Sequence, residues 1–586
     1  MGRLIKELGK KELILFLLSV GIIALQVWAE LELIDRMQEV TKLVVAPGGT
    51  TTKVLYAGAK MLALATVGVL CSVAVGYAAS VIGANLSYKL RGKLFHQVQL
   101  FSMEEINRFS TASLITRSTN DITQVQTLVS MGMLVALRAP IMAVWAMSKI
   151  ATKNWQWSIT VIAAVVMLCL LLACIFLIAV PRFKKIQKLT DDINERMREN
   201  LTGLRVVHAF NAESFQEKKF ANANEALAKN NLVAHRVMAS IHPVMTAIMS
   251  GLSLSIYWIG FYLIDAAKAP DKLNLYSEMV VFSSYAMQIV MSFMMMSFIF
   301  IMFPRAMVSA RRIREVLTTD PKIKPGDRKD GLPGVKGEVR FENVSFAYPD
   351  AENPILEHIT FEANEGETVA FIGSTGSGKT TVINLIPRFY DVTSGGVFVD
   401  GVNVKEYDSQ ALVEKIGYVS QKAVLFSGTV TSNVTYGNEG RKEERENVFS
   451  ALKTASAYDF VMDKEGQESA VVARGGANYS GGQKQRLSIA RALYKKPEIL
   501  IFDDSFSALD YKTDKELRAA LKKQAKGTTL LIVAQRIGTI MDADKIIVLD
   551  EGKISAMGTH RELLKTSTVY REIAESQLSE EELDNE

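Results

Sequence analysis

Long apolar runs are concentrated in the first 305 residues of the chain, whereas from about residue 335 onward the pattern is that of a soluble α/β protein. Runs of about twenty uncharged residues are long enough to cross a bilayer, while globular cores hold runs of roughly ten to fourteen. The pattern therefore predicts six membrane-spanning helices followed by a soluble domain. The expected spans are Leu13–Ala29, Met61–Ala84, Leu128–Ser148, Ser158–Pro181, Val244–Ile264 and Met279–Phe303.

Positive charges indicate how these spans are oriented. Lys and Arg precede the first span and are abundant after the second and fourth, but are fewer in the short segments after the first, third and fifth. Because cytoplasmic loops carry an excess of Lys and Arg, the N-terminus and the soluble domain should both be cytoplasmic. Glu30, Glu32 and Asp35 follow the first span in place of a small-residue cleavage site, which argues against a signal peptide. The long cytoplasmic segments should be helical extensions of the spans.

Composition sets the remaining boundaries and argues against some partners. Pro, Gly and charged residues predict a linker at 321–336, between a membrane domain at 1–320 and a soluble domain at 337–574, with an acidic tail at 575–586. The net charge of +5 comes without basic blocks interleaved with aromatics, so no nucleic-acid partner is expected. The cysteines lie inside expected spans, so a disulfide framework is not expected and the soluble half fits a reducing compartment.

A glycine-rich loop in the soluble domain predicts a nucleotide site. It reads Gly373-Ser374-Thr375-Gly376-Ser377-Gly378-Lys379-Thr380, follows an apolar strand pattern and precedes a helix-like run that begins at Thr381, which we also assign to the site. In a P-loop in this context, backbone N–H groups at a helix N-terminus wrap the phosphates of ATP. Lys379 should reach the β- and γ-phosphates, and the Thr380 hydroxyl should ligate Mg²⁺. A chance glycine-rich loop is the plainer alternative, but it would not require this strand–loop–helix context.

A second motif follows the P-loop at a suitable distance. The apolar strand pattern Ile499–Asp503 ends in two consecutive carboxylates, Asp503 and Asp504. Asp503 fits the Mg²⁺ ligand at the end of a Walker B strand. A surface aspartate that merely ends a strand is the alternative, and the accompanying P-loop argues against it.

Between these motifs lies Tyr479-Ser480-Gly481-Gly482-Gln483, which resembles the signature of ABC transporters, usually Leu-Ser-Gly-Gly-Gln. P-loop, signature and Walker B strand in this order, after six spans, make nearly the whole chain similar to an ABC exporter half-transporter. The resemblance implies an α-helical membrane domain of six transmembrane helices with long cytoplasmic extensions, plus a C-terminal α/β P-loop ABC ATPase domain. It also implies that Tyr348 stacks on adenine, that Gln421 senses and ligates Mg²⁺, and that 507–510 forms the D-loop.

Two positions depart from the family pattern. The family has Glu after the Mg²⁺ aspartate, where it polarises the attacking water; this chain has Asp504, which is shorter by one methylene. A carboxylate misplaced by about 1 Å can cost about a hundredfold in rate. The family has a switch His that contacts the γ-phosphate; this chain has Gln535, which cannot carry a proton near neutral pH. We therefore expect a site that binds ATP but hydrolyses it poorly, with neutral variation in a working ATPase as the alternative.

The resemblance also implies a partner, because nucleotide-binding domains of this family pair head to tail. Each ATP then lies between one P-loop and the other chain's signature, so Ser480–Gln483 should complete the ATP site of a second half-transporter that carries the Glu and the His. Such a heterodimer would export hydrophobic or amphipathic cargo, drugs or lipids, across the lipid bilayer of a bacterial plasma (inner) membrane. An ATP-binding membrane sensor or regulator, and a homodimeric lipid flippase, are the alternatives.

Two features of the spans bear on cargo. Methionine is soft and adaptable, so a methionine-rich span could line a promiscuous cavity, although packing or lipid contact is the plainer interpretation. The methionines of the sixth span are Met287, Met291, Met294, Met295, Met296 and Met302. Arg138 lies in the third apolar run, and an intramembrane charge is either functional or snorkels to the outer face.

Overall fold

The computed structural model describes residues 9–45, 50–151, 154–349, 351–437, 445–524 and 527–578. The chain forms two compact units. The helical unit comprises Met1–Gln99 and Thr111–Thr319, and the sheet unit comprises Leu100–Ser110 and Asp320–Glu586. The segment 100–110, which the sequence placed in the membrane domain, therefore groups with the sheet unit.

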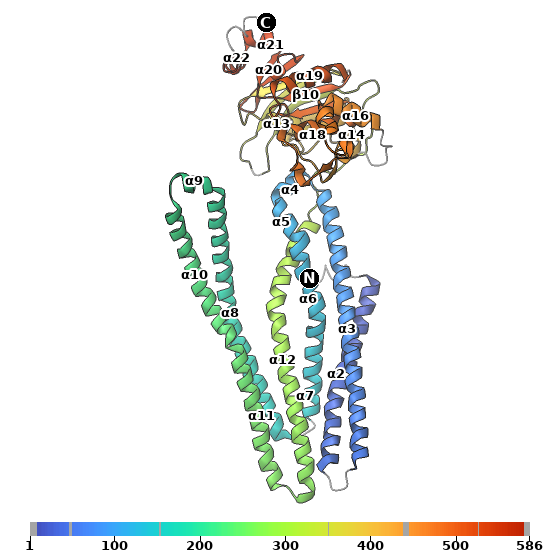
Figure 1. The fold of residues 1–586 in the computed structure, drawn as a ribbon, viewed down its shortest axis with the longest axis vertical. Helices are drawn as coiled ribbons and strands as arrows, with labels where there is room; N and C mark the ends of the chain where they lie inside the picture. The colour runs from blue at the N-terminus through green and yellow to red at the C-terminus, as the bar shows by residue number, and fades with distance from the viewer. Residues whose placement is uncertain are drawn as a thin grey trace. The chain divides into compact units, whose positions relative to one another are not determined.

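The helical unit is built from long helices, as its apolar and amphipathic stretches predict (Figure 1). Among the described residues, six helical segments are long and apolar enough to cross a membrane, which confirms the expected number of spans. The helix α3 has 49 residues, roughly 70 Å of helix, which exceeds a hydrocarbon core of about 30 Å. The elements are α2 (Lys10–Val45), α3 (Thr51–Gln99), α5 (Thr111–Thr116), η1 (Arg117–Asp121), α6 (Ile122–Gly132), η2 (Met133–Leu137), α7 (Arg138–Ala151), α8 (Trp155–Thr202), α9 (Leu204–Ala209), α10 (Glu213–Ala239), α11 (Ile241–Ala266) and α12 (Ala269–Leu317).

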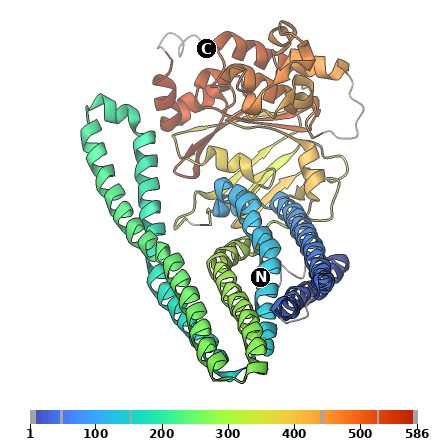
Figure 2. The ribbon, with the colours of Figure 1, turned by 60° about the horizontal axis from the view of Figure 1, so that its bottom comes forward.

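One helical extension is a hairpin of two helices. α8 and α10 run side by side, and the short α9 joins them at the tip (Figures 1 and 2). Pro181, where the fourth span was expected to end, lies inside α8, and the helix continues to Thr202. A proline inside a helix removes one backbone hydrogen bond. Beside Pro181, Asn230 of α10 donates through Nδ2 to the carbonyl of Arg182 at 3.1 Å.

Two basic side chains of α7 pair with acidic side chains of α2. Arg138 Nη2 lies 2.9 Å from both carboxylate oxygens of Glu30, and Lys149 Nζ lies 2.7 Å from Asp35 Oδ2. The buried Tyr285 hydroxyl donates to Asp35 Oδ1 at 2.6 Å. Pairing with Glu30 accounts for an arginine in an apolar run, because a charge in a membrane is tolerated best beside an opposite charge.

The sheet unit contains a parallel sheet and a smaller antiparallel one. The six-stranded sheet has the order β12-β11-β3-β10-β9-β6 and is parallel except for β12, while the four-stranded sheet has the order β2-β1-β4-β5. The elements are α4 (Met103–Phe109), β1 (Val339–Phe346), β2 (Leu356–Ala363), β3 (Thr368–Gly373), α13 (Lys379–Leu385), β4 (Ser394–Val399), β5 (Val402–Asn403), α14 (Ser409–Lys415), β6 (Ile416–Val419), β7 (Gly428–Thr429), α15 (Val430–Val434), α16 (Arg445–Thr454), α17 (Tyr458–Met462), η3 (Gln467–Ser469), β8 (Val471–Val472), η4 (Arg474–Gly476), α18 (Gly481–Tyr494), β9 (Ile499–Asp503), α19 (Tyr511–Gln524), β10 (Thr529–Val533), α20 (Ile537–Ile540), β11 (Lys545–Asp550), β12 (Lys553–Gly558), α21 (His560–Thr566) and α22 (Thr568–Glu575).

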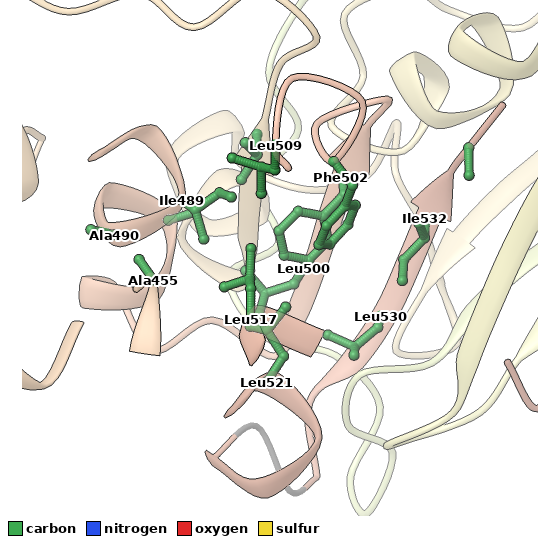
Figure 3. Packing of buried hydrophobic residues seen from close by; sticks show 14 of the residues in the cluster. Ala455, Ile489, Ala490, Leu500, Phe502, Leu509, Leu517, Leu521, Leu530 and Ile532 are labelled. Carbon is green, nitrogen blue, oxygen red and sulfur yellow. The ribbon is translucent and has the colours of Figure 1, made fainter. Parts of the chain in front are cut away.

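The interior strands of the six-stranded sheet are buried. Every residue of β9 and β10 is buried, as expected for interior strands of a parallel sheet with both faces covered. In the cluster drawn in Figure 3, Leu500 and Phe502 of β9 pack with Leu517 and Leu521 of α19 and with Ile489 of α18. Because β3, β10, β9 and β6 run parallel, their carboxyl ends meet at one edge of the sheet.

The segment expected as a linker is fastened to the sheet unit. Gly326 N–H donates to the carbonyl of Tyr407 at 2.8 Å, and Asp408 N–H donates to the carbonyl of Arg328 at 2.8 Å. A Cβ on Gly326 would lie 2.1 Å from the carbonyl oxygen of Glu406, so this close approach requires glycine. At the other end of the unit, α22 and an ordered turn carry the fold to Leu578, and the rest of the expected acidic tail lies outside the described residues.

Candidate nucleotide-binding site

The P-loop joins β3 to α13, as its sequence context predicts. Gly376 and Gly378 have φ angles of 87° and 97°, in the left-handed region that glycine adopts without strain. A Cβ on Gly378 would lie 2.5 Å from Leu356 Cδ2, so a larger residue would be excluded there. The loop therefore exposes backbone N–H groups at a helix N-terminus, which is the arrangement that binds phosphate.

Lys379 folds over this loop. Its Nζ donates to the carbonyls of Gly373 at 2.9 Å and Ser374 at 2.7 Å, and lies 3.4 Å from Ser377 Oγ. Burial lowers the pKa of Lys379, and the negative charge of Asp504 opposes this shift. The ammonium group is thus held at the loop centre by carbonyl acceptors, which phosphate oxygens could replace.

The two residues predicted to hold Mg²⁺ are brought together. Thr380 Oγ1 donates to Asp503 Oδ1 at 2.7 Å, although the two residues are 123 positions apart in the chain. Burial raises the pKa of Asp503, while hydrogen bonds from Thr380 and Tyr418 lower it. A hydroxyl and a carboxylate oxygen at this distance fit Mg²⁺, which takes hard oxygen ligands and substrate phosphates.

The two residues that depart from the family pattern also meet. Gln535 follows β10 and Asp504 follows β9, and Gln535 Nε2 donates to Asp504 Oδ2 at 2.8 Å. Gln421, the expected Mg²⁺ sensor after β6, donates to the same oxygen at 3.1 Å. Burial raises the pKa of Asp504, although hydrogen bonds from Gln421 and Ser507 and the nearby positive charges of Lys379 and Arg536 oppose this rise. One carboxylate oxygen thus binds both glutamine amides.

The other expected site residues are placed as follows. Tyr348 lies beside the P-loop helix, with its hydroxyl 3.2 Å from Thr381 Oγ1 and its ring packed edge-on against Tyr390. In the signature, Ser480 caps α18: its hydroxyl accepts from Gln483 N–H at 3.3 Å, and Gln483 Oε1 accepts from Ser480 N–H at 3.1 Å. Among the described residues, the signature makes no hydrogen bond to the P-loop of its own chain.

One contributing residue was missed by the sequence reasoning. Tyr418 donates through its hydroxyl to Asn384 Oδ1 at 2.9 Å and lies 3.4 Å from Asp503 Oδ2. Burial and the charge of Asp503 raise the pKa of the Tyr418 hydroxyl, so it remains a donor at neutral pH. Its position three residues before Gln421 is the signal that could have identified it, because β6 ends at the same edge of the sheet as β9.

Comparisons with known proteins agree with this geometry. The family model described as ABC transporter matches residues 356–507, and the ABC transporter transmembrane region matches residues 36–308. An uncharacterized ABC transporter ATP-binding protein of Mycobacterium tuberculosis strain H37Rv is 40% identical over 537 residues, covering 91% of this chain and 90% of the relative. An ATP-dependent lipid A-core flippase of Syntrophus aciditrophicus is 30% identical over 528 residues, covering 88% and 84%.

A solved structure shares the fold of the whole chain. The structure of a bacterial Atm1-family ABC exporter with ATP bound has a TM-score of 0.79 and 24% sequence identity, and covers 97% of this chain and 99% of that chain. The fold class inferred from the sequence is therefore confirmed, and the sheet unit is an ABC domain that binds ATP, normally with Mg²⁺. The chain belongs to the ABC transporter family, as an exporter half-transporter that carries its membrane domain and its ATP-binding domain in one polypeptide.

Proposed function

We propose that this chain is the hydrolysis-impaired subunit of a heterodimeric exporter of hydrophobic or amphipathic compounds. Its own P-loop site holds Mg-ATP through Lys379, Thr380 and Asp503 but turns it over slowly. Its signature completes the competent site of a second half-transporter. The pair lies in a bacterial plasma membrane, with the nucleotide-binding domains in the cytoplasm.

The observation that carries this proposal is the Asp504–Gln535 hydrogen bond of 2.8 Å. A base that activates water must offer a free carboxylate oxygen within hydrogen-bond reach of that water. Asp504 Oδ2 accepts from two amides, and the Asp504 side chain is one methylene shorter than the glutamate of the family pattern. Gln535 can donate a hydrogen bond but cannot take up a proton. Both changes affect water activation, while the residues assigned to phosphate and Mg²⁺ binding keep their expected types.

The signature supports the partner role. Its serine and glutamine form a reciprocal cap on the 14-residue helix α18, and Ser480 is exposed at that helix N-terminus. Backbone N–H groups and a hydroxyl in this position favour the negative charge of a phosphate. Ser480 and Gly481 are exposed, which leaves this helix N-terminus accessible to a nucleotide bound by a second chain.

A homodimeric lipid flippase is the second candidate, favoured by the name of the Syntrophus relative. The two candidates differ in what the chain does without a partner. A homodimer must hydrolyse ATP at the Asp504 site, whereas the heterodimer model expects the isolated chain to bind ATP and turn it over far more slowly than the pair. A sensor or regulator would bind ATP without moving cargo.

The test is steady-state ATPase of the complex purified through a tag on this chain, with substitutions made in this chain only. Ser480→Ala or Gly482→Asp should reduce turnover by about tenfold or more, because the first removes a hydroxyl donor from the partner's site and the second places a negative charge beside the phosphates. Asp504→Asn should change turnover less than about twofold. ATP-dependent flux in vesicles distinguishes transport from sensing.

The opposite pattern would reject the heterodimer. If Asp504→Asn abolished turnover and the signature changes had no effect, the site called impaired would be the active one. If no second half-transporter co-purified and this chain alone hydrolysed ATP rapidly, the homodimeric flippase would be favoured.

A further inference from the structure

The last turn of the sheet unit contacts the loop that carries Gln535. α22 buries Tyr570 and Ala574, and the N–H groups of Gln577 and Leu578 donate to the carbonyl of Ala574 at 3.0 and 2.9 Å. The Tyr570 hydroxyl lies 2.7 Å from Nδ1 of the buried His560. The C-terminal turn is therefore anchored to the core of the unit, although its side chains at 575–577 are exposed.

The side-chain amide of Gln577 pairs with two backbone groups of that loop. Its Nε2 donates to the carbonyl of Gln535 at 2.8 Å, and its Oε1 accepts from the N–H of Ile537 at 2.9 Å. The Gln535 carbonyl precedes Arg536 and the Ile537 N–H follows it. One side-chain amide therefore holds the backbone on both sides of Arg536. Ile537 begins α20, whose N-cap Arg536 makes no side-chain capping bond, so Gln577 satisfies an N–H that the helix leaves unpaired.

The rest of the loop is fixed by the sheet. Ala534 N–H donates to the carbonyl of Phe371 at 3.1 Å, and Asp504 N–H donates to the carbonyl of Val533 at 3.0 Å. The backbone leaves the sheet after Ala534, and Gln577 provides its next contact. The position from which the Gln535 side chain reaches Asp504 Oδ2 therefore depends on a residue 42 positions further along the chain.

From this geometry we propose that Gln577 is a positioning residue of the ATP site. By holding the carbonyl of Gln535 and the N–H of Ile537, it fixes the switch glutamine against Asp504 and slows the release of bound nucleotide. This inference rests on the proposed role of Gln535 at the γ-phosphate. It makes the turn at 575–578 a determinant of nucleotide release.

The experiment uses the full chain in lipid nanodiscs, with a fluorescent trinitrophenyl derivative of ATP and Mg²⁺ as the probe. Gln577→Met keeps the length of the side chain but loses both hydrogen bonds. It should speed release of the probe by about threefold to tenfold, as expected for the loss of contacts of this kind. Amide hydrogen exchange at Ile537 should accelerate in the same variant, while the unfolding temperature stays near that of the parent.

Two variants separate positioning from a general effect on α22. Gln577→Glu keeps an acceptor for the Ile537 N–H but places a carboxylate against the Gln535 carbonyl, so probe release should accelerate while Ile537 stays protected. Ser576→Ala is the matched control, because Ser576 Oγ donates only within its own turn, to the carbonyl of Ile573 at 2.7 Å, and it should change neither quantity.

The variant Gln535→Ala separates failure of this inference from failure of the proposed function. If Gln535→Ala speeds release and Gln577→Met does not, Gln577 has no positioning role. If Ser576→Ala acts as strongly as Gln577→Met, the effect belongs to α22 as a whole and the inference is again wrong. If Gln535→Ala leaves release unchanged, the assignment of Gln535 to the γ-phosphate fails instead.

Discussion

Restoring the family residues at both departing positions should convert the impaired site into a hydrolytic one. The change is Asp504→Glu combined with Gln535→His, made in the full chain. The additional methylene advances the carboxylate by about 1 Å, and a displacement of that size is associated with about a hundredfold change in rate. The histidine supplies a group that can take up a proton near neutral pH. We therefore expect single-turnover hydrolysis to rise by about tenfold to a hundredfold.

The two single variants should fall short of the double one. Asp504 Oδ2 now accepts from Gln535 at 2.8 Å and from Gln421 at 3.1 Å, so lengthening the carboxylate alone still leaves it bound to amides. Residues that act as one unit give effects that do not add, and the double variant should exceed the sum of the singles.

The assay follows hydrolysis of radiolabelled Mg-ATP under single-turnover conditions, after saturation binding has shown that the single and double variants retain their nucleotide. The matched control adds Lys379→Ala to the double variant. Loss of a charge-assisted phosphate contact should abolish the gain. If the double variant binds nucleotide normally and hydrolyses it at the parent rate, side-chain identity at these positions does not explain the impairment, and the reasoning fails.

Two further predictions concern pH and cargo. Burial raises the pKa of Asp504, so its charged form destabilises the fold above that raised pKa, and this cost disappears as the pH falls through it. Asp504→Asn should therefore raise the unfolding temperature at neutral pH and raise it less in acid. Asp510, whose pKa hydrogen bonds from Thr513 lower, is the control of opposite sign: Asp510→Asn should lower the unfolding temperature at neutral pH and lose this effect in acid, and an identical pH response of the two variants would contradict the assignment. Met291 and Met295 lie one turn apart on α12 with exposed fractions of 41% and 40%. If they line the cargo cavity, replacing both with Ala should change which drugs are exported more than it changes basal ATPase activity. An unaltered drug profile at normal expression would favour lipid contact or packing.

The sequence by itself determined the architecture and the nucleotide motifs. Apolar run length is a local property, so six spans could be counted without knowing their contacts, and the structure has six candidate helices among its described residues. The P-loop could also be predicted from the sequence, because its glycines, its lysine and the flanking strand and helix are adjacent in the chain. The Walker B strand gave the same kind of signal, and β9 has the expected bounds, Ile499–Asp503.

Only the tertiary structure decided how distant polar residues pair. Arg138 could be functional or could snorkel when judged from its apolar run, and its partner Glu30 lies 108 residues away. Segment 321–336 had the composition of a free linker, yet backbone hydrogen bonds, which composition does not encode, fasten it beside 406–408. The meeting of Asp504 with Gln535 and Gln421 likewise depends on three strands ending at one edge.

Gln577 shows the physical reason most clearly. An exposed glutamine near an acidic tail has no periodicity, no neighbouring motif and no unusual composition to mark it. Its role comes from geometry: α22 is anchored by Tyr570 and Ala574, and this places one amide against the two backbone groups that flank Arg536. Helix, strand and loop signals arise from neighbours in sequence, whereas this contact exists only after the core has brought residues 42 positions apart within hydrogen-bond distance.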